Sequence, residues 1–419
     1  MIPIFSEQIE YIENNKQYGI KVDWNLIYKD YIKIIKKACG SSKVFDSIYL
    51  PKPPLNSARW FVDMSERSVG KTTNYIIIGM LLYKYYGIKI EYIRLKKDGI
   101  MPKNASQLFK TIRMFNYISI IFDDKYNDVK MGARCWYLVK KDPNGKILEE
   151  DDEEIMHMHS LENSEVDNEK SVYNSPKGDW VILDEFIPVD GITNEQQFIN
   201  LFQLLSTIRR SRKSLKIILL ANTINKYTHF FKELCISREV QSLKMGEQKI
   251  VETNRGVKLW VHLIKFSEKI SEKRIINNLE FFGFDNPKLN SIIGGEEWET
   301  YNYPHLPRKE REEKRKCILN KGVYFKVYDD YLAIEFWESD VIGKYMFIRQ
   351  QTNLPITDKS IVYTLEVPTK KNEIYGIGIG KKLEKAIVSM YNQRRVFYNH
   401  NECGSQFEYY LNEINKRRI

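Results

Sequence analysis

RWFVDMSERSVGKTTNYIIIGMLLYKYYG, residues 59–87, changes its character twice along its length. Residues 59–64 are a short apolar run, as expected for a buried strand. Residues 65–73 are polar, and residues 74–87 form an apolar stretch long enough for a buried helix that ends at Gly87. A strand, a polar loop and a helix in this order predict one unit of a parallel sheet covered by helices.

The alternation of strand and helix continues downstream. A hairpin interrupts it, because Asp142-Pro143-Asn144-Gly145 has the residue types of a tight turn between two extended runs. The pattern predicts an α/β fold with a parallel sheet. We predict further strands at 88–95, 179–185 and 214–222, a helix over 105–115 capped by Asn104, and a helix over 195–210 capped by Asn194.

Changes in composition divide the chain into four parts. Asp23 is expected to cap a helix that Gly40 ends, and a proline-rich stretch then breaks the chain. After about residue 322 the chain becomes β-rich, with runs at 324–338, 344–350 and 361–367 followed by two helices. We therefore predict a helical N-terminal extension at 1–50, an α/β domain at 51–245, a linker or helical region at 246–318 and a C-terminal domain at 319–419.

The chain of 419 residues has a formal net charge of +10 and a sequence pI of about 9.0. Positive charge favours an acidic polymer as partner, of which nucleic acid is the commonest. No signal peptide and no apolar run of membrane-spanning length is seen, so we expect a soluble intracellular protein with no membrane partner. Scattered cysteines without Cys-x-x-Cys spacing argue against a disulfide framework or structural zinc: Cys39, Cys135, Cys235, Cys317 and Cys403.

The polar loop at residues 65–72 has the spacing of a P-loop, with Ser65 in place of the usual first glycine. Backbone N–H groups at a helix start attract phosphate oxygens, Gly70 lets the backbone approach them, and Lys71 adds a positive charge. A chance Gly-Lys-Thr is the alternative, but a strand before it and a helix after it argue against chance. The loop predicts ATP and Mg²⁺ as cofactors, bound by Ser65, Glu66, Arg67, Ser68, Val69, Gly70, Lys71, Thr72 and Thr73.

Two carboxylates, Asp184 and Glu185, follow the apolar run Val-Ile-Leu. The carboxyl end of a parallel strand faces the ligand crevice of its sheet. We therefore expect Asp184 to hold Mg²⁺ together with Thr72, and Glu185 to orient and deprotonate the attacking water. A glutamate directly after the aspartate indicates an NTPase that carries its own catalytic base, as translocases and helicases do. Solvated acids at a strand end are the alternative.

Further candidate residues lie near the ends of neighbouring elements. Arg210 and Arg212 follow the helix after the acidic pair, and in ring ATPases such an arginine contacts the γ-phosphate of the neighbouring subunit. The alternative is a pair of cations that offset the dipole at a helix end. Asn222 ends the next strand and is expected to sense the γ-phosphate or hold the water, unless it only forms a turn. Arg94, at the end of the strand at 88–95, is expected to face the same site.

The order of these motifs resembles that of the DNA-packaging ATPases of small protein-primed podophages, the phi-29-like encapsidation proteins. VILDEF at 181–186, the Arg-x-Arg pair, ILLAN at 218–222 and Glu169-Lys170-Ser171 carry the resemblance. It covers most of residues 59–235 and, more weakly, the β-rich C-terminal part.

This resemblance implies an additional-strand, catalytic-glutamate P-loop NTPase domain, a linker, and a nuclease-inactive C-terminal RNase H-like domain that binds nucleic acid or the portal. It implies a homomeric ring, usually a pentamer, at the portal of an empty capsid in the host cytoplasm. The ring drives double-stranded DNA inward at the expense of ATP, with packaging RNA as a possible further partner. Arg210 becomes the trans-acting finger and Lys170 a second trans-acting cation. The catalytic set is then Lys71, Glu185, Arg210, Arg212 and Asn222.

Three other functions stay open on the sequence alone. Another P-loop motor, such as a helicase, would share Lys71 and the acidic pair. A nucleic-acid-binding scaffold would use the P-loop only to regulate assembly. A live nuclease, as in terminases, would hold metals through the acids Asp329, Asp330, Glu335, Glu338 and Asp340.

Two smaller patterns can be interpreted either as functional sites or as ordinary structural features. His157 and His159 share one face of a predicted strand, so a metal is conceivable, although a surface strand fits better without a third ligand. Basic residues on loops would contact DNA phosphates or lie on an ordinary solvated surface. The candidates for DNA contact are Lys96, Lys97, Lys103, Lys125 and Lys130. The C-terminal basic residues could instead bind RNA or the portal: Lys381, Lys382, Arg394, Arg395, Lys416, Arg417 and Arg418.

Overall fold

The computed structural model divides into two compact units. The first comprises Met1–Ile224, Ser242–Asp285 and Ile293–Glu297, and the second Asn225–Gln241, Asn286–Ile292 and Trp298–Ile419. Within the described residues, no helix is long and apolar enough to cross a membrane. The structure describes residues 9–12, 17–40, 50–65, 70–162, 177–188, 193, 195–209, 213–223, 226–265, 303–306, 316–317, 323–327, 330–340, 343–350, 356–365, 367–376 and 382–416.

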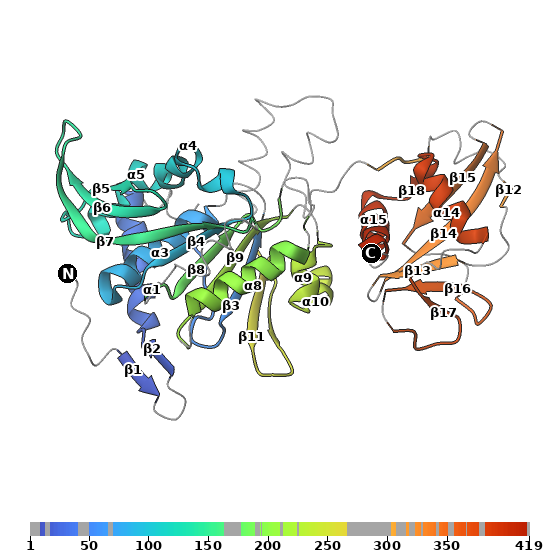
Figure 1. The fold of residues 1–419 in the computed structure, drawn as a ribbon, viewed down its shortest axis with the longest axis horizontal. Helices are drawn as coiled ribbons and strands as arrows, with labels where there is room; N and C mark the ends of the chain where they lie inside the picture. The colour runs from blue at the N-terminus through green and yellow to red at the C-terminus, as the bar shows by residue number, and fades with distance from the viewer. Residues whose placement is uncertain are drawn as a thin grey trace. The chain divides into compact units, whose positions relative to one another are not determined.

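A nine-stranded sheet, in the order β10-β11-β3-β9-β8-β4-β7-β6-β5, organises the first unit (Figure 1). From β11 to β7 all neighbouring strands are parallel. Strand β9 lies between β3, which precedes the P-loop, and β8, which carries the acidic pair, so the predicted additional-strand fold is confirmed. The bounds of the parallel strands are β3 Trp60–Ser65, β4 Ile90–Arg94, β7 Ile147–Ser160, β8 Trp180–Asp184, β9 Lys216–Asn222 and β11 Lys258–Leu263.

The predicted hairpin extends this sheet at one edge. β6 (Cys135–Lys141) pairs antiparallel with β7 and with β5 (Asp128–Met131). The backbone N–H of Asp142 donates to the carbonyl of Lys146 at 2.9 Å, and Gly145 has φ +84°, as the tight turn requires.

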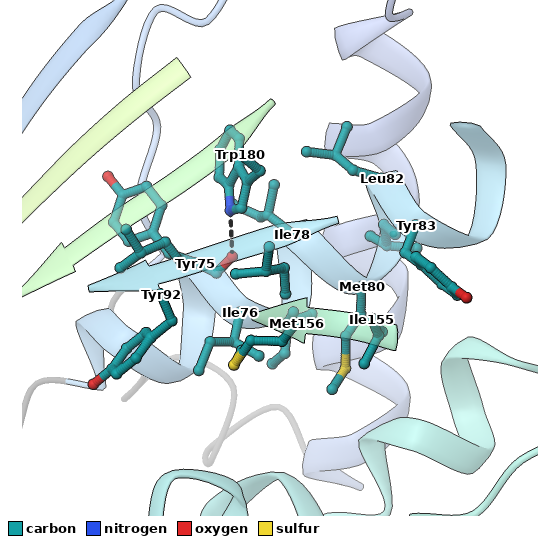
Figure 2. Packing of buried hydrophobic residues seen from close by; sticks show 14 of the residues in the cluster. Tyr75, Ile76, Ile78, Met80, Leu82, Tyr83, Tyr92, Ile155, Met156 and Trp180 are labelled. Carbon is teal, nitrogen blue, oxygen red and sulfur yellow. Dashed lines mark hydrogen bonds between the residues drawn. The ribbon is translucent and has the colours of Figure 1, made fainter. Parts of the chain in front are cut away.

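Helix α3 (Lys71–Tyr86) is buried along most of its length and ends at Gly87, as predicted. It covers the sheet face that carries Phe61 and Asp63, while α8 (Glu195–Arg209) stacks its Phe202 on Trp60 of the opposite face, 5.6 Å between ring centroids. Figure 2 shows the α3 core, where Nε1 of Trp180 donates to the carbonyl of Tyr75 at 3.0 Å.

Gly79 of α3 is the point where this core is tightest. A Cβ there would lie 2.6 Å from Cγ1 of Ile90 and 2.9 Å from Cδ1 of Trp180. Overpacking costs about 1–3 kcal/mol and exceeds the helix propensity that alanine gains, about 1 kcal/mol. We expect Gly79→Ala to lower the melting temperature by several degrees in a thermal unfolding scan. The exposed Ser206→Ala on α8 should change it little, and an unchanged Gly79→Ala protein would contradict this packing.

The N-terminal helix is part of the first unit, so the predicted separate extension at 1–50 is corrected. Helix α1 (Trp24–Cys39) begins at Asp23, whose carboxylate accepts from two backbone N–H groups, and ends at Gly40, as predicted. Its buried residues Ile27, Tyr31 and Ile35 lie in the same hydrophobic core as α3. The apolar stripe of this helix therefore needs the α/β domain to cover it. Ahead of it, β1 (Ile9–Ile12) and β2 (Gln17–Ile20) pair antiparallel.

The boundary predicted at residue 245 is also corrected. β10 (Gln248–Glu252) and β11 pair antiparallel, and β11 pairs parallel with β3, so both belong to the first sheet. The apolar residues of KLWVHL, at 258–263, are buried, and because three of them are consecutive they occupy both faces of that sheet. The segment Asn225–Gln241, placed by prediction in the α/β domain, groups with the second unit and contains α9 (His229–Glu233) and most of α10 (Ser237–Ser242).

The helix predicted over 105–115 is broken into short pieces, and Asn104 is not its cap. Pro102 starts α4 (Pro102–Ala105), and Asn104 lies inside it, donating to the carbonyl of Asp98 at 2.7 Å. The backbone leaves helical geometry at Phe109, where φ is −95° and ψ is 5°. The other short pieces are η3 Lys97–Ile100, η4 Ser106–Phe109, α5 Lys110–Met114 and α6 Tyr117–Ile121.

The second unit contains a sheet in the order β17-β16-β13-β14-β15-β18, with β12 (Lys316–Cys317) on β14. β13, β14 and β15 form an antiparallel meander, and β16 and β17 continue parallel to β13 on its other side. This arrangement, 3-2-1-4-5 in chain order, confirms the predicted RNase H-like sheet. The bounds are β13 Val323–Val327, β14 Asp330–Ser339, β15 Gly343–Arg349, β16 Ile361–Thr364, β17 Glu373–Tyr375 and β18 Val396–Tyr398.

Two details of this unit differ from the prediction. The run at 324–338 forms two paired strands, β13 and β14, because the chain reverses between Val327 and Asp330. The C-terminal helices are α14 (Lys382–Asn392) and α15 (Asn401–Lys416), and α15 contributes Phe407 and Tyr410 to the core on one face of the sheet.

Candidate functional site

The carboxyl ends of four parallel strands meet at one edge of the first sheet. Ser65 ends β3 and pairs in register with Asn222, which ends β9. Asp184 ends β8 and Arg94 ends β4. The structure thus brings together residues that the sequence placed far apart.

Lys71, the first residue of α3, is directed toward the ends of β3 and β9. Its side chain is buried, and Nζ donates to Oγ of Ser65 and, at 3.5 Å, to Oδ1 of Asn222. Gly70 precedes it with φ +82°, a left-handed conformation that allows the turn from strand to helix. The ammonium is therefore held at the head of a helix, where the helix dipole also favours an anion.

Thr72 and Asp184 form a hydroxyl–carboxylate pair beside Lys71. The Thr72 hydroxyl lies 3.1 Å and 3.0 Å from the two oxygens of Asp184. Tyr92, on β4, donates its hydroxyl to Oδ2 of Asp184 at 2.7 Å. Burial and the charge of Asp184 raise the pKa of Tyr92 well above its usual value, so this tyrosine stays a neutral donor. A hydroxyl and a fixed carboxylate are the oxygen ligands that Mg²⁺ takes beside a phosphate, so the donor set fits this metal.

Glu185 has a left-handed backbone, with φ +54°. A non-glycine residue in this conformation costs about 1–2 kcal/mol and is concentrated at functional sites. Nη2 of Arg94 forms an ion pair with Oε2 of Glu185.

Arg94 connects both carboxylates. Its Nη1 lies 3.3 Å from Oδ2 of Asp184 and donates to the hydroxyl of Tyr92 at 3.4 Å. Burial alone would lower the pKa of Arg94, but Tyr92, Asp184 and Glu185 together raise it above its usual value. The guanidinium is thus a permanent positive charge shared between the two acids.

A cavity of about 820 Å³ opens beside these residues. Thr72, Thr73, Asp184 and Glu185 line one part of it. The short helical pieces after β4 line another part, with Asn104, Gln107 and Thr111 among the polar residues. Its size is that of small-molecule sites, which measure about 300–1,000 Å³.

Tyr92 is a site residue that the sequence interpretation missed. It lies two positions before Arg94, so strand alternation places both side chains on one face, and that spacing could have revealed it. A second missed group lies behind the P-loop helix. The buried Asp63 of β3 accepts from the hydroxyl of Tyr75 at 3.0 Å, and its other oxygen lies 3.0 Å from Nδ1 of His262.

Several predicted residues lie outside the described part of the chain. They are Glu66, Arg67, Ser68 and Val69 of the P-loop, the trans-acting candidates Lys170 and Arg210, and Arg212. Arg209, the last residue of α8, is exposed. The roles expected of these residues stay predictions.

The two histidines of β7 do share one face, with ring centroids 4.6 Å apart, but the half of the strand that carries them is largely buried and is not a surface strand. His159 is buried and lies 2.7 Å from Oε2 of the buried Glu91, while Nδ1 of His157 lies 3.1 Å from Sγ of Cys135. Within the described residues, no group of three or more His, Cys, Asp or Glu side chains is arranged to hold a metal ion.

Two of the C-terminal acids have partners within their own unit. Asp330 accepts from Nε2 of Gln406 at 3.1 Å, and Glu335 pairs with Arg349. Asp329 lies outside the described residues. Of the basic candidates, Lys130 pairs with Glu150 at 2.8 Å, whereas Lys96 is exposed at the cavity.

No family model and no curated protein matches the sequence. Solved structures that resemble the chain include the Phi-28 gp11 DNA packaging motor, with 18% identity, 87% of this chain and 98% of that chain covered, and a TM-score of 0.43. The bacteriophage Phi-29 viral genome packaging motor assembly has 14% identity, 87% and 100% coverage, and a TM-score of 0.44. A large terminase from a thermophilic bacteriophage, in complex with ADP, has 12% identity, 91% and 90% coverage, and a TM-score of 0.33.

Proposed function

We propose that this protein is an ATPase whose hydrolysis drives double-stranded DNA into a viral capsid. One observation carries the ATPase: Lys71, the Thr72–Asp184 pair and Glu185 converge where the parallel strands β3 and β8 end, with β9 between these two strands. A lysine, a metal-binding pair and a separate glutamate are the parts that nucleotide hydrolysis needs.

Each residue then has a distinct task. Lys71 and the helix start bind the phosphates, Thr72 and Asp184 hold the metal, and Asn222 lies against Lys71 where the γ-phosphate would be sensed. Bound Mg²⁺ supplies charge neutralisation at the β- and γ-phosphates. Glu185, on its own turn, is the group that accepts the proton of the attacking water.

Arg94 regulates that base. In the structure its guanidinium forms an ion pair with an oxygen of Glu185, so that this oxygen faces Arg94 and not an attacking water. Hydrolysis therefore requires the ion pair between Glu185 and Arg94 to break. DNA binding is the event that we assign to this release, because a translocase must not hydrolyse ATP without its track.

Replacing Arg94 tests this assignment. In Arg94→Gln we expect the ratio of DNA-stimulated to DNA-free turnover to fall by about threefold to tenfold, which corresponds to the loss of one hydrogen bond worth about 0.7–1.4 kcal/mol. Phosphate release with and without duplex DNA measures the ratio. Lys110→Gln, an exposed cation on α5, is the matched control and should keep the wild-type ratio. An Arg94→Gln ratio equal to that of the control would remove Arg94 from this role.

DNA as the track is supported by the motif order from the P-loop to ILLAN, the RNase H-like sheet of the second unit, and the net charge of +10. We further propose a ring, a pentamer on the portal in the host cytoplasm, with Arg210 and Lys170 acting on the neighbouring site and packaging RNA as a possible partner. Such a motor grips phosphates without reading bases, so its affinity for DNA falls with salt.

The testing experiment is ATP hydrolysis with and without blunt double-stranded DNA, followed by a strand-displacement assay on a forked duplex. DNA-stimulated hydrolysis without displacement supports a packaging translocase. Displacement of the strand would identify a helicase instead. Hydrolysis that ignores DNA at every salt concentration would contradict both motors.

A further inference from the structure

The strand that carries Asn222 continues directly into a segment of the second unit. β9 ends at Asn222 in the first unit, and residues 226–233, which we call the transmission segment, belong to the second unit. Only two residues of the sequence, at 224 and 225, separate Thr223 from Lys226.

The upstream end of this short connection is fixed to the nucleotide site. The backbone N–H of Thr223 donates to the carbonyl of Ser65 at 2.9 Å, and the side chain of Asn222 lies against Lys71. Thr223 is buried. A change in the position of Lys71 or Ser65 therefore acts on the end of β9.

The downstream end is fixed to α15 by an aromatic and polar contact. Tyr227 is buried in the core of the second unit, with its ring 6.0 Å from that of Tyr409. Its hydroxyl accepts from Nε2 of Gln406 at 2.5 Å, and the neighbouring Lys226 pairs with Glu402. Burial and the charge of Glu402 raise the pKa of Tyr227 well above its usual value, so this phenol keeps its proton.

A second contact lies further along α15. Glu413 of α15 is buried, and its two oxygens face two basic side chains of α9. Nζ of Lys232 pairs with Oε2, and Nε2 of His229 lies 3.4 Å from Oε1. Separating α9 from α15 would leave this carboxylate buried without its lysine, which is strongly unfavourable. The transmission segment and α15 therefore move together.

We infer that residues 226–233 transmit the nucleotide state of the Lys71–Asn222 contact to helix α15 of the RNase H-like unit, with Glu413 and Lys232 as positioning residues. This inference rests on the proposed function and names the route by which its site would act on the second unit. Loss of the γ-phosphate changes what Lys71 binds, and this change displaces the end of β9. The contact with α15 carries that displacement onward, whereas β10 and β11 return the chain to the first sheet.

Hydrogen exchange of the full chain tests it, with and without a non-hydrolysable ATP analogue and Mg²⁺. We expect the analogue to slow exchange at residues 70–80, and also at 226–233 and 401–413 by about fivefold or more, the lower range of allosteric coupling. In the double variant Lys232→Gln/Glu413→Gln, residues 70–80 should keep their protection while the response at 401–413 disappears. Lys385→Gln, exposed on α14, is the control and should respond as wild type.

The outcomes separate the two levels of the proposal. Protection at 70–80 without any response at 401–413 in the wild type overturns the transmission route and leaves the ATP site standing. A response at 401–413 that survives in the double variant also overturns it. No protection at 70–80 at saturating analogue refutes the nucleotide site and the route together. The wild-type experiment tests the route even if the double variant does not fold. In that case Glu402→Gln replaces the double variant, and we expect it to reduce the response at 401–413 by a smaller amount.

Discussion

Glu185→Gln should bind ATP as tightly as the wild type and hydrolyse it about 10²–10⁴-fold more slowly, the range for loss of a positioned general base. Glutamine has the shape of glutamate and tolerates the same left-handed backbone, so the turn at φ +54° should survive. It has no carboxylate to accept the proton of the attacking water. Lys71, Thr72 and Asp184 remain in place, so the phosphates and the metal keep their ligands. Single-turnover phosphate release measures the chemical step, and a fluorescent ATP analogue measures binding.

The control is Glu195→Gln, the same chemical change at an exposed position at the start of α8. It should leave both binding and turnover unchanged. A second result would also count against the assignment: if Glu185→Gln lost binding and hydrolysis in equal proportion, Glu185 would be supporting the structure of the site rather than acting as its base.

Much of this site follows from the sequence, because each of its parts obeys a local rule. A polar loop between an apolar strand and an apolar helix predicts the place of Lys71 and Thr72. Apolar strands ending in polar residues place Asp184, Asn222 and Arg94 at one sheet edge, since parallel strands bring their carboxyl ends together. The register of Ser65 with Asn222 and the contact of Arg94 with both acids agree with that reasoning.

The predictions that were wrong concern residues whose burial depends on partners distant in the chain. The pattern of α1 shows an apolar stripe but not that α3 covers it, so the sequence predicts an extension where the structure has part of the core. His159 is polar, yet it is buried because Glu91 of the neighbouring strand lies beside it. β11 is separated from its parallel neighbour β3 by most of the first unit, so the residues near β11 in the sequence do not indicate its place in the sheet.

Lys71→Met should slow hydrolysis about 10²–10³-fold and weaken ATP binding at least tenfold. Methionine keeps the buried alkyl part of the side chain but removes the ammonium that Ser65 and Asn222 hold at the head of α3. One preorganised donor to a developing charge is worth about 2.7–4 kcal/mol, a rate factor of about 10²–10³, and the same charge also contributes to binding the ground-state phosphates. Lys71→Met should therefore lower affinity and rate together, whereas Glu185→Gln lowers the rate alone.

The opposite end of the same helix offers the matched control for Lys71. Lys84 lies about three and a half turns further along α3, where it pairs with Asp123 at 2.7 Å, far from the acidic pair. Lys84→Met makes the same substitution in the same helix and should hydrolyse ATP at the wild-type rate, with at most a small loss of thermal stability. If both variants lost activity alike, the effect would come from destabilising α3. If Lys71→Met kept full activity, the loop before α3 would not be the phosphate site, because that variant lacks the ammonium on which the assignment depends.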